Sequence, residues 1–217
     1  MKSKTLELIT REKLIVIVRG IESERLIPLA EALYKGGVRV MEITYSMKED
    51  NSVTADAIKM LTDYMQDRMC IGAGTVLTTE QVELTRQSGG RFIISPDTNT
   101  EVIKRTLELD MVSMPGALTP TEATTAYRAG ADIIKLFPIT NMGTDYVKAI
   151  RAPLSGIKFA AVGGIDDKNI SDYIKTGIDC FGVGSNIVSK KSLTDGNYEK
   201  ITELAKSYIN VIREGCR

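Results

Sequence analysis

Residues 14–44 read LIVIVRGIESERLIPLAEALYKGGVRVMEIT, and the fold is most clearly visible in this segment. It begins with a β-branched run, continues through a helical pattern and reaches a second apolar run. Gly36 and Gly37 separate the helical pattern from the second run, and a glycine in the left-handed conformation commonly ends a helix. Pro28 lies inside the helical pattern and weakens the prediction of a helix there. The stretch therefore predicts one strand–helix–strand unit.

The same unit repeats along the chain. Successive apolar runs begin 25, 31, 21, 20, 21, 26 and 22 residues apart, which is room for one strand, one helix and two short loops. The runs are LIVIVR (14–19), RVMEIT (39–44), CIGAGT (70–75), RFIISP (91–96), MVSMP (111–115), DIIKLF (132–137), KFAAVG (158–163) and CFGVGS (180–185). Their apolar character on both faces is typical of parallel strands that helices cover.

Eight such units predict the α/β class and a closed (β/α)8 TIM barrel, with 1–217 as a single domain. A doubly wound open sheet is the alternative. Further helix stops are expected at Gly89-Gly90, Gly130 and Gly177. Helix starts are expected at three capping boxes, which are Thr78 with Gln81, Thr98 with Glu101, and Thr119 with Glu122.

The composition excludes several kinds of chemistry. The 28 basic and 28 acidic residues give a formal charge of zero, so nothing favours nucleic acid or an anionic membrane as a partner. The chain contains no histidine, which rules out Ser-His-Asp catalysis and metals bound by imidazole. Acid–base chemistry must therefore come from carboxylates, lysine, tyrosine, cysteine or water.

The three cysteines, Cys70, Cys180 and Cys216, fit neither a disulfide framework nor a zinc site. Cys70 and Cys180 lie in apolar runs and are expected in the core of a protein from a reducing compartment. The first residues contain no apolar signal segment, and no run approaches 18 apolar residues. These features predict a soluble cytoplasmic protein.

Lys135 is the strongest candidate for a catalytic group. It lies between Ile134 and Leu136 in an apolar run, and a lysine is almost never buried without a partner. Burial disfavours the ammonium ion and lowers the pKa, which makes the amine a nucleophile toward carbonyl groups. The structural alternative is a lysine that extends to solvent from the strand end or forms an ion pair inside the barrel.

Glu42 lies near the end of the second run and is a candidate general acid or base acting through water. Alternatively, it only neutralises Lys135 or Arg19. An acidic and a basic side chain that come from different strands and point into one cavity favour an enzyme.

Residues at the other strand ends predict how a substrate is held, because chemistry in such a barrel lies at the C-terminal ends of the strands. The glycines of 161–166 and 182–186 follow the last two runs, where such barrels commonly bind phosphate; the alternative is tight turns that need a positive φ. Arg19 and Thr75 are candidates to bind a substrate carboxylate. The alternative for Arg19 is an ion pair with Glu42, and the alternative for Thr75 is a residue that only forms a turn. Three further pocket residues are expected: Thr44, Pro96 and Phe137.

Eight motifs follow one another along about residues 8–214: VRG (18–20), GGVRVMEITYS (36–46), IGAGTVL (71–77), ISP (94–96), MPGALTPTE (114–122), IKLFP (134–138), AVGGI (161–165) and GVGS (182–185). Their combination resembles the 2-keto-3-deoxy-6-phosphogluconate (KDPG) aldolase family. That family includes 4-hydroxy-2-oxoglutarate (KHG) aldolases and 2-keto-3-deoxy-6-phosphogalactonate aldolases.

The resemblance implies a homotrimeric class I aldolase that acts on small 2-keto acids and aldehydes without a metal or other cofactor. The Schiff-base lysine of the family corresponds to Lys135, and its acid–base glutamate corresponds to Glu42. The carboxylate-binding residues correspond to Arg19 and Thr75, and the phosphate-binding elements to Gly163, Gly164 and Ser185. Some members carry an arginine at the position of Ser46, so Arg19 must contribute more to anion binding here.

The implied reaction is cleavage of KDPG to pyruvate and glyceraldehyde 3-phosphate, or of KHG to pyruvate and glyoxylate. The galactonate-type substrate is the alternative, and the VRGI and AVGG sequences favour it slightly. Two other functions compete with an aldolase. A phosphosugar isomerase or decarboxylase would use Lys135 only electrostatically, and a sugar-acid sensor would bind without turnover.

Overall fold

A computed structural model describes residues 1–215 of the chain, and its sheet is wholly parallel. Nine strands follow the order β5-β4-β3-β2-β1-β9-β8-β7-β6. The strands are β1 (Leu14–Val18), β2 (Val40–Thr44), β3 (Cys70–Gly74), β4 (Phe92–Ile94), β5 (Val112–Met114), β6 (Gly116–Ala117), β7 (Ile134–Leu136), β8 (Phe159–Val162) and β9 (Cys180–Val183).

The two outermost strands in this order close the sheet into a barrel. β5 and β6 are consecutive in the chain and are separated only by Pro115, so they share one barrel position. β5 pairs with β4, whereas β6 pairs with β7, and the Lys135 amide donates to the Pro115 carbonyl at 2.9 Å. The predicted (β/α)8 barrel is therefore confirmed, and the open doubly wound sheet is not formed.

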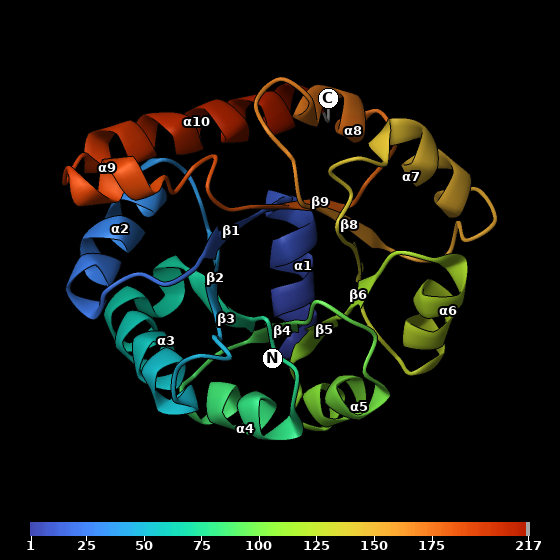
Figure 1. Cartoon of the computed structure of the whole chain (residues 1–217), viewed down its shortest axis with the longest axis horizontal. Helices are drawn as coiled ribbons and strands as arrows, with labels where there is room; N and C mark the ends of the chain where they lie inside the picture. The colour runs from blue at the N-terminus through green and yellow to red at the C-terminus, as the bar shows by residue number, and fades with distance from the viewer. Residues whose placement is uncertain (216–217) are drawn as a thin grey trace.

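Helices surround the barrel as a ring (Figure 1). They are α2 (Ser23–Lys35), α3 (Asn51–Met65), η1 (Gln66–Arg68), α4 (Thr79–Gln87), α5 (Thr100–Glu108), α6 (Pro120–Arg128), α7 (Gly143–Arg151), α8 (Ile170–Ile174), α9 (Lys190–Thr194) and α10 (Tyr198–Gly215). Despite Pro28, α2 continues through the proline to Lys35. Within residues 1–215, no helix has the length and apolar character needed to cross a membrane.

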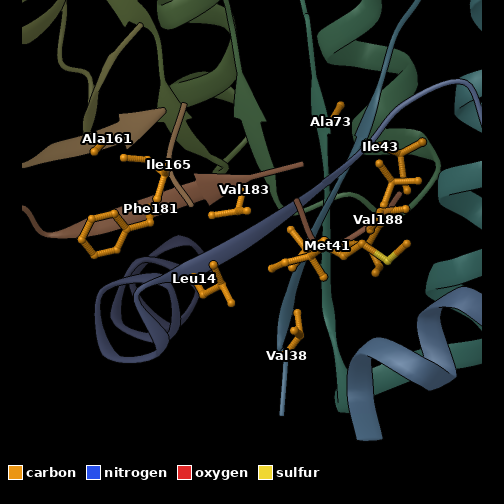
Figure 2. Packing of buried hydrophobic residues seen from close by; sticks show 14 of the residues in the cluster. Leu14, Val38, Met41, Ile43, Ala73, Ala161, Ile165, Phe181, Val183 and Val188 are labelled. Atoms are coloured by element: carbon orange, nitrogen blue, oxygen red, sulfur yellow. The ribbon is translucent and has the colours of Figure 1, made fainter. Parts of the chain in front are cut away.

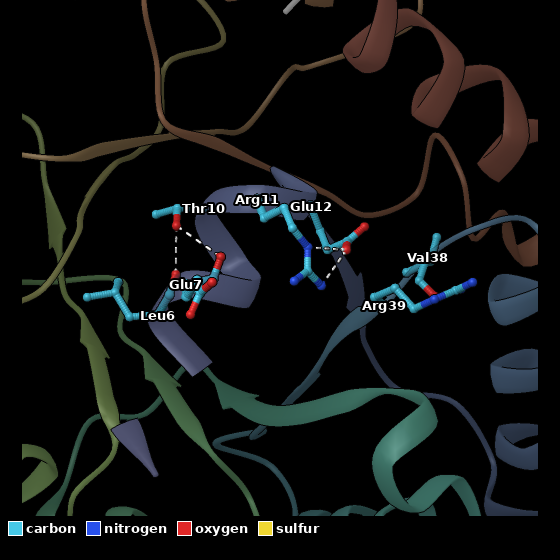
Figure 3. A network of polar contacts seen from close by, with 7 residues as sticks. All are labelled: Leu6, Glu7, Thr10, Arg11, Glu12, Val38 and Arg39. Atoms are coloured by element: carbon cyan, nitrogen blue, oxygen red, sulfur yellow. Dashed lines mark hydrogen bonds and ion pairs between the residues drawn. The ribbon is translucent and has the colours of Figure 1, made fainter. Parts of the chain in front are cut away.

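Helix α1 (Lys2–Glu12) lies across the middle of the ring rather than in it (Figure 1). Its Ile9 is fully buried and packs with residues of the barrel interior. Its last turn carries polar contacts (Figure 3), with Thr10 donating to the Leu6 carbonyl at 2.9 Å and Arg11 paired with Glu12 at 2.9 Å. Because α1 runs directly into β1 and packs on the first residues of the strands, it lies at their N-terminal ends and leaves the opposite mouth, at their C-terminal ends, for the site.

The core has two layers because both faces of the sheet are covered. The outer layer lies between strands and helices; Figure 2 shows part of it, including Leu14, Met41 and Val183. The inner layer fills the barrel and contains Cys70 and Cys180, as predicted. Each large apolar side chain that is fully buried contributes roughly 1.5–3 kcal/mol. Cys216 lies outside the described residues.

Two of the three predicted capping boxes are present, at Thr78 with Gln81 and at Thr119 with Glu122. The prediction for Thr98 with Glu101 was wrong, since Asn99 caps α5 by accepting from the amides of Glu101 and Val102. The reason is a tertiary contact: the Thr98 hydroxyl donates to the Gly116 carbonyl at 2.7 Å. The cap therefore starts one residue later.

Candidate functional site

Lys135 lies in the middle of β7, and its side chain is directed into the barrel. Residues two apart on a strand face the same side, and Ile133 belongs to the inner layer while Phe137 packs against it. The residue paired with Lys135 on β8, Ala160, belongs to the inner layer too. The residue is 6% exposed, and its Nζ lies 4.5 Å from the centre of the Phe137 ring. Lys135 therefore does not extend to solvent, contrary to the first structural alternative.

The Lys135 amine has a lowered pKa. Burial is the main cause and the nearby Arg19 cation adds to it, whereas the negative charge of Glu42 acts in the opposite direction. Glu42 acts on Lys135 through its charge and not through a hydrogen bond. Within residues 1–215, no ion pair joins the two side chains, so the second structural alternative is not observed either. A buried amine of this kind is shifted toward its neutral, nucleophilic form.

Glu42 projects into the same interior from β2, which is separated from β7 by three strands in the sheet order. It follows the inward-facing Val40 by two residues, and it is only 2% exposed. Its Oε2 is buried with no hydrogen-bond partner among residues 1–215. The unpartnered oxygen is open to a substrate or a water molecule.

The pKa of Glu42 is raised, chiefly by burial, while the charges of Lys135 and Arg19 oppose this shift. The pKa values of Glu42 and Lys135 are thus shifted in opposite directions, and each shift favours the neutral form of its group. A neutral carboxylic acid donates a proton, and its conjugate base accepts one, so Glu42 has the properties of a general acid–base group.

Gly74 makes room for the Glu42 carboxyl group. A methyl group at Gly74 would lie 1.5 Å from Glu42 Oε1, far inside van der Waals contact. Gly74 was not predicted as a site residue. The small residues Gly72, Ala73 and Gly74 predicted only an open barrel mouth, because a local sequence does not show which side chain of another strand lies against it.

Arg19 and Thr75 meet at the barrel mouth, and Arg19 Nη2 donates to Thr75 Oγ1 at 3.3 Å. The predicted alternative, an ion pair between Arg19 and Glu42, is not formed within residues 1–215. Thr75 has a φ of 57°, which is unusual for a β-branched residue. Strict alternation after the inward Gly74 would turn the Thr75 side chain outward, so this backbone conformation accounts for its contact with Arg19.

The two predicted phosphate loops follow β8 and β9. Gly163 and Gly164 have φ values of 94° and 72°, so they form the tight turn with positive φ that was the alternative explanation for these glycines. The amides of Gly163, Gly164 and Ser185 donate to no backbone acceptor among residues 1–215. Asn169 holds the first loop by donating to the Gly164 carbonyl at 2.7 Å. The loop after β8 is therefore a tight turn, and both loops have amide groups available to an anion.

The remaining predicted residues lie at strand ends. Thr44 is buried at the end of β2, and its Oγ1 has no partner within residues 1–215. Pro96 is half-buried after β4, with its carbonyl directly beside Gly116, and Phe137 follows β7. Ser46, the position of the missing arginine, accepts from the Lys48 amide at 3.2 Å and serves a local turn.

A family model and the curated relatives point to one family. The family model "KDPG and KHG aldolase" matches residues 6–204. A probable 2-dehydro-3-deoxy-6-phosphogalactonate aldolase of Rhizobium meliloti is 41% identical, over 80% of this chain and 81% of its own length. A KHG/KDPG aldolase of Escherichia coli is 32% identical, over 90% and 89%.

A crystal structure gives the same result. KDPG aldolase from Legionella pneumophila, with pyruvate captured at low pH as a covalent carbinolamine intermediate, superposes with a TM-score of 0.85. It is 31% identical, and the match covers 93% of this chain and 96% of that chain.

Proposed function

Because this chain belongs to the KDPG and KHG aldolase family, we propose that it cleaves 2-keto-3-deoxy-6-phospho sugar acids to pyruvate and glyceraldehyde 3-phosphate. Cleavage of 4-hydroxy-2-oxoglutarate to pyruvate and glyoxylate is the same reaction on an unphosphorylated substrate. The observation that carries the proposal is a buried lysine that has no ion-pair partner among residues 1–215 and shares the barrel interior with a buried glutamate.

Lys135 is the proposed nucleophile. Its neutral amine attacks the carbon-2 ketone of the substrate to give a carbinolamine, which loses water to form a protonated imine. This imine accepts the electron pair of the bond between carbons 3 and 4 when that bond breaks. The products of the step are an aldehyde and a pyruvate enamine still attached to Lys135.

Glu42 is the proposed proton carrier, acting through a water molecule. As an acid it donates the proton that the departing carbinolamine hydroxyl needs, and as a base it takes the proton from the carbon-4 hydroxyl. Protonation of the enamine at carbon 3 and hydrolysis of the imine then release pyruvate and restore the amine. The buried, unpartnered Oε2 of Glu42 supports this role.

The proposed substrate contacts divide between the two ends of the pocket. Arg19 and Thr75 bind the carboxylate beside the reacting ketone, which their mutual hydrogen bond supports. The amides of Gly163 and Gly164, with Ser185, bind the phosphate at the other end. Thr44, Pro96 and Phe137 complete the pocket wall, and the ring of Phe137 lies next to the amine.

The galactonate-type substrate, which differs at carbon 4, is a second candidate. It is favoured by the 41% identity to the R. meliloti protein and by Val162 in the AVGG sequence. Cleavage rates for the two purified epimers would separate the candidates.

The test of the mechanism is trapping with pyruvate and borohydride, followed by intact-mass analysis and peptide mapping. We expect one adduct, on Lys135, in the wild type and in Lys158→Met, which removes an exposed lysine at the start of the next strand unit. Lys135→Met should form none. An unmodified wild type that still binds a phosphosugar acid would favour an isomerase or a sensor instead.

We also propose that the protein is a cytoplasmic homotrimer. The resemblance to the family supports the trimer, and exposed apolar side chains such as Met47, which is 89% exposed, are suited to contacts between copies. The two buried free thiols, Cys70 and Cys180, suit a reducing compartment. Sedimentation velocity would measure the number of subunits.

A further inference from the structure

The loop between β7 and α7 lies directly against the glycine pair that follows β8. The Ile139 amide donates to the Val162 carbonyl at 3.2 Å, so the loop is tied to the strand that precedes Gly163. This contact places Thr140 over both glycines. Nothing in the sequence motifs pointed to Thr140, because it stands 23 residues before Gly163.

Thr140 covers the side of Gly163 and Gly164 where a side chain would otherwise be. A methyl group at Gly164 would lie 2.9 Å from both Cα and Cγ2 of Thr140, which is tighter than ordinary contact. A methyl group at Gly163 would lie 3.5 Å from Thr140 Oγ1. The methyl of Thr140 thus packs on one glycine, and its hydroxyl faces the other.

The Thr140 hydroxyl is close enough to share a ligand with the Gly163 loop. Carbon–carbon and carbon–nitrogen bonds are about 1.5 Å long, so Thr140 Oγ1 lies within about 5 Å of Gly163 Cα and within about 6.5 Å of the Gly163 amide nitrogen. Two donors that bind the same oxygen at about 2.8 Å each can be up to roughly 5.6 Å apart, and donors to two different oxygens of one phosphate can be farther apart. Thr140 is also exposed, so its hydroxyl is accessible to a ligand.

The loop lacks a side-chain donor of its own at this point. The residue before the glycine pair is Val162, which is apolar and belongs to the inner layer of the core. Beside Gly163 and Gly164 the loop therefore presents backbone amides, and the Asn169 side chain is already bound to the Gly164 carbonyl, whereas a phosphate has three oxygens that accept several hydrogen bonds. A hydroxyl from the neighbouring loop fills this gap.

We propose that Thr140 is a specificity-determining residue whose hydroxyl donates to the substrate phosphate together with the Gly163-Gly164 loop. The inference rests on the proposed function, since it assigns one more contact to the same site. It predicts that Thr140 distinguishes phosphorylated from unphosphorylated substrates. It predicts no role for Thr140 in imine formation, which takes place on β7.

The experiment measures KM and kcat of three proteins, wild type, Thr140→Val and Thr140→Ser, on KDPG and on KHG. Valine keeps the shape that packs on Gly164 but has no hydroxyl, and serine keeps the hydroxyl. A hydrogen bond to a charged group affects binding by roughly tenfold or more. We expect Thr140→Val to raise KM for KDPG about tenfold and to leave KM for KHG and both kcat values within twofold. Thr140→Ser should stay near the wild type on both substrates.

Two results would overturn the assignment: an unchanged KM for KDPG in Thr140→Val, or an equal loss on both substrates, which would indicate packing alone. Failure of the proposed function is seen separately, because the wild type would then release pyruvate from neither substrate and form no adduct at Lys135. If the wild type acts only on the galactonate epimer, that epimer replaces KDPG in the same comparison. Circular dichroism of each variant verifies its folding.

Discussion

Gly74→Ala should inactivate the enzyme by displacing the carboxyl group of Glu42. The added methyl would lie 1.5 Å from Glu42 Oε1, whereas ordinary contact begins near 3.4 Å, so the carboxyl must move by about 2 Å. A misplacement of about 1 Å in an active site can lower the rate about 100-fold, and general acid–base catalysis contributes up to about 10,000-fold. We therefore expect kcat to fall between about 100-fold and 10,000-fold.

The fold should survive this substitution. The clashing atoms are the end of a flexible side chain and not backbone, so the overpacking should cost only about 1–3 kcal/mol of unfolding free energy. Pyruvate release, coupled to lactate dehydrogenase, measures kcat, and urea denaturation measures stability. Gly156→Ala is the matched control, because no atom of the part of the chain that the structure describes lies within 4 Å of the methyl that it adds.

A double-mutant cycle tests the cause of the loss. In a Glu42→Ala background the carboxyl is gone, so adding Gly74→Ala should leave kcat unchanged. Wild-type kcat in Gly74→Ala would show that the Glu42 carboxyl is not displaced, and a further large loss in the Glu42→Ala background would show that Gly74→Ala acts on another group.

Three other substitutions or treatments have defined outcomes. Glu42→Gln removes the negative charge that raises the pKa of Lys135, so the pH at half-maximal imine formation with pyruvate should fall; a rise would contradict the assignment. Lys135→Met removes a buried amine that has no ion-pair partner among residues 1–215, so it should increase stability at neutral pH by about 1–3 kcal/mol in urea denaturation. The folded amine binds its proton less tightly than the unfolded one, so wild-type stability should rise with pH from the lowered pKa up to about 10.5, and that slope should be absent in the variant. Burial raises the pKa of the Cys70 and Cys180 thiols to about 12, so a thiol reagent at pH 8 should label the peptides that contain them only after denaturation, as mass spectrometry would show.

Much of the fold was predictable because its causes are local. A short apolar run precedes or forms each strand, and two helices begin at the predicted capping boxes, as at Thr119 with Glu122, where the bonds join residues three apart. The burial of Lys135 and Glu42 also followed from their apolar neighbours. Their proposed roles came in addition from the resemblance to the family.

Other features depended on contacts between distant segments. The start of α5 moved from Thr98 to Asn99 because the Gly116 carbonyl binds the Thr98 hydroxyl. The barrel position expected at 111–115 became two strands, because Pro115 has no amide proton to donate to a neighbouring strand.

Side-chain alternation and helix capping act over a few residues, so the sequence was enough to place the apolar strand runs and to identify Lys135 and Glu42 as buried polar groups. Which side chains meet depended on the packing of the whole barrel. Closure of the barrel sets the distance between Arg19 and Thr75, the fit of Glu42 over Gly74, and the position of Thr140 on Gly164. These contacts join different strands and loops, so their geometry depends on the packing of the whole barrel and not on any single stretch of the chain.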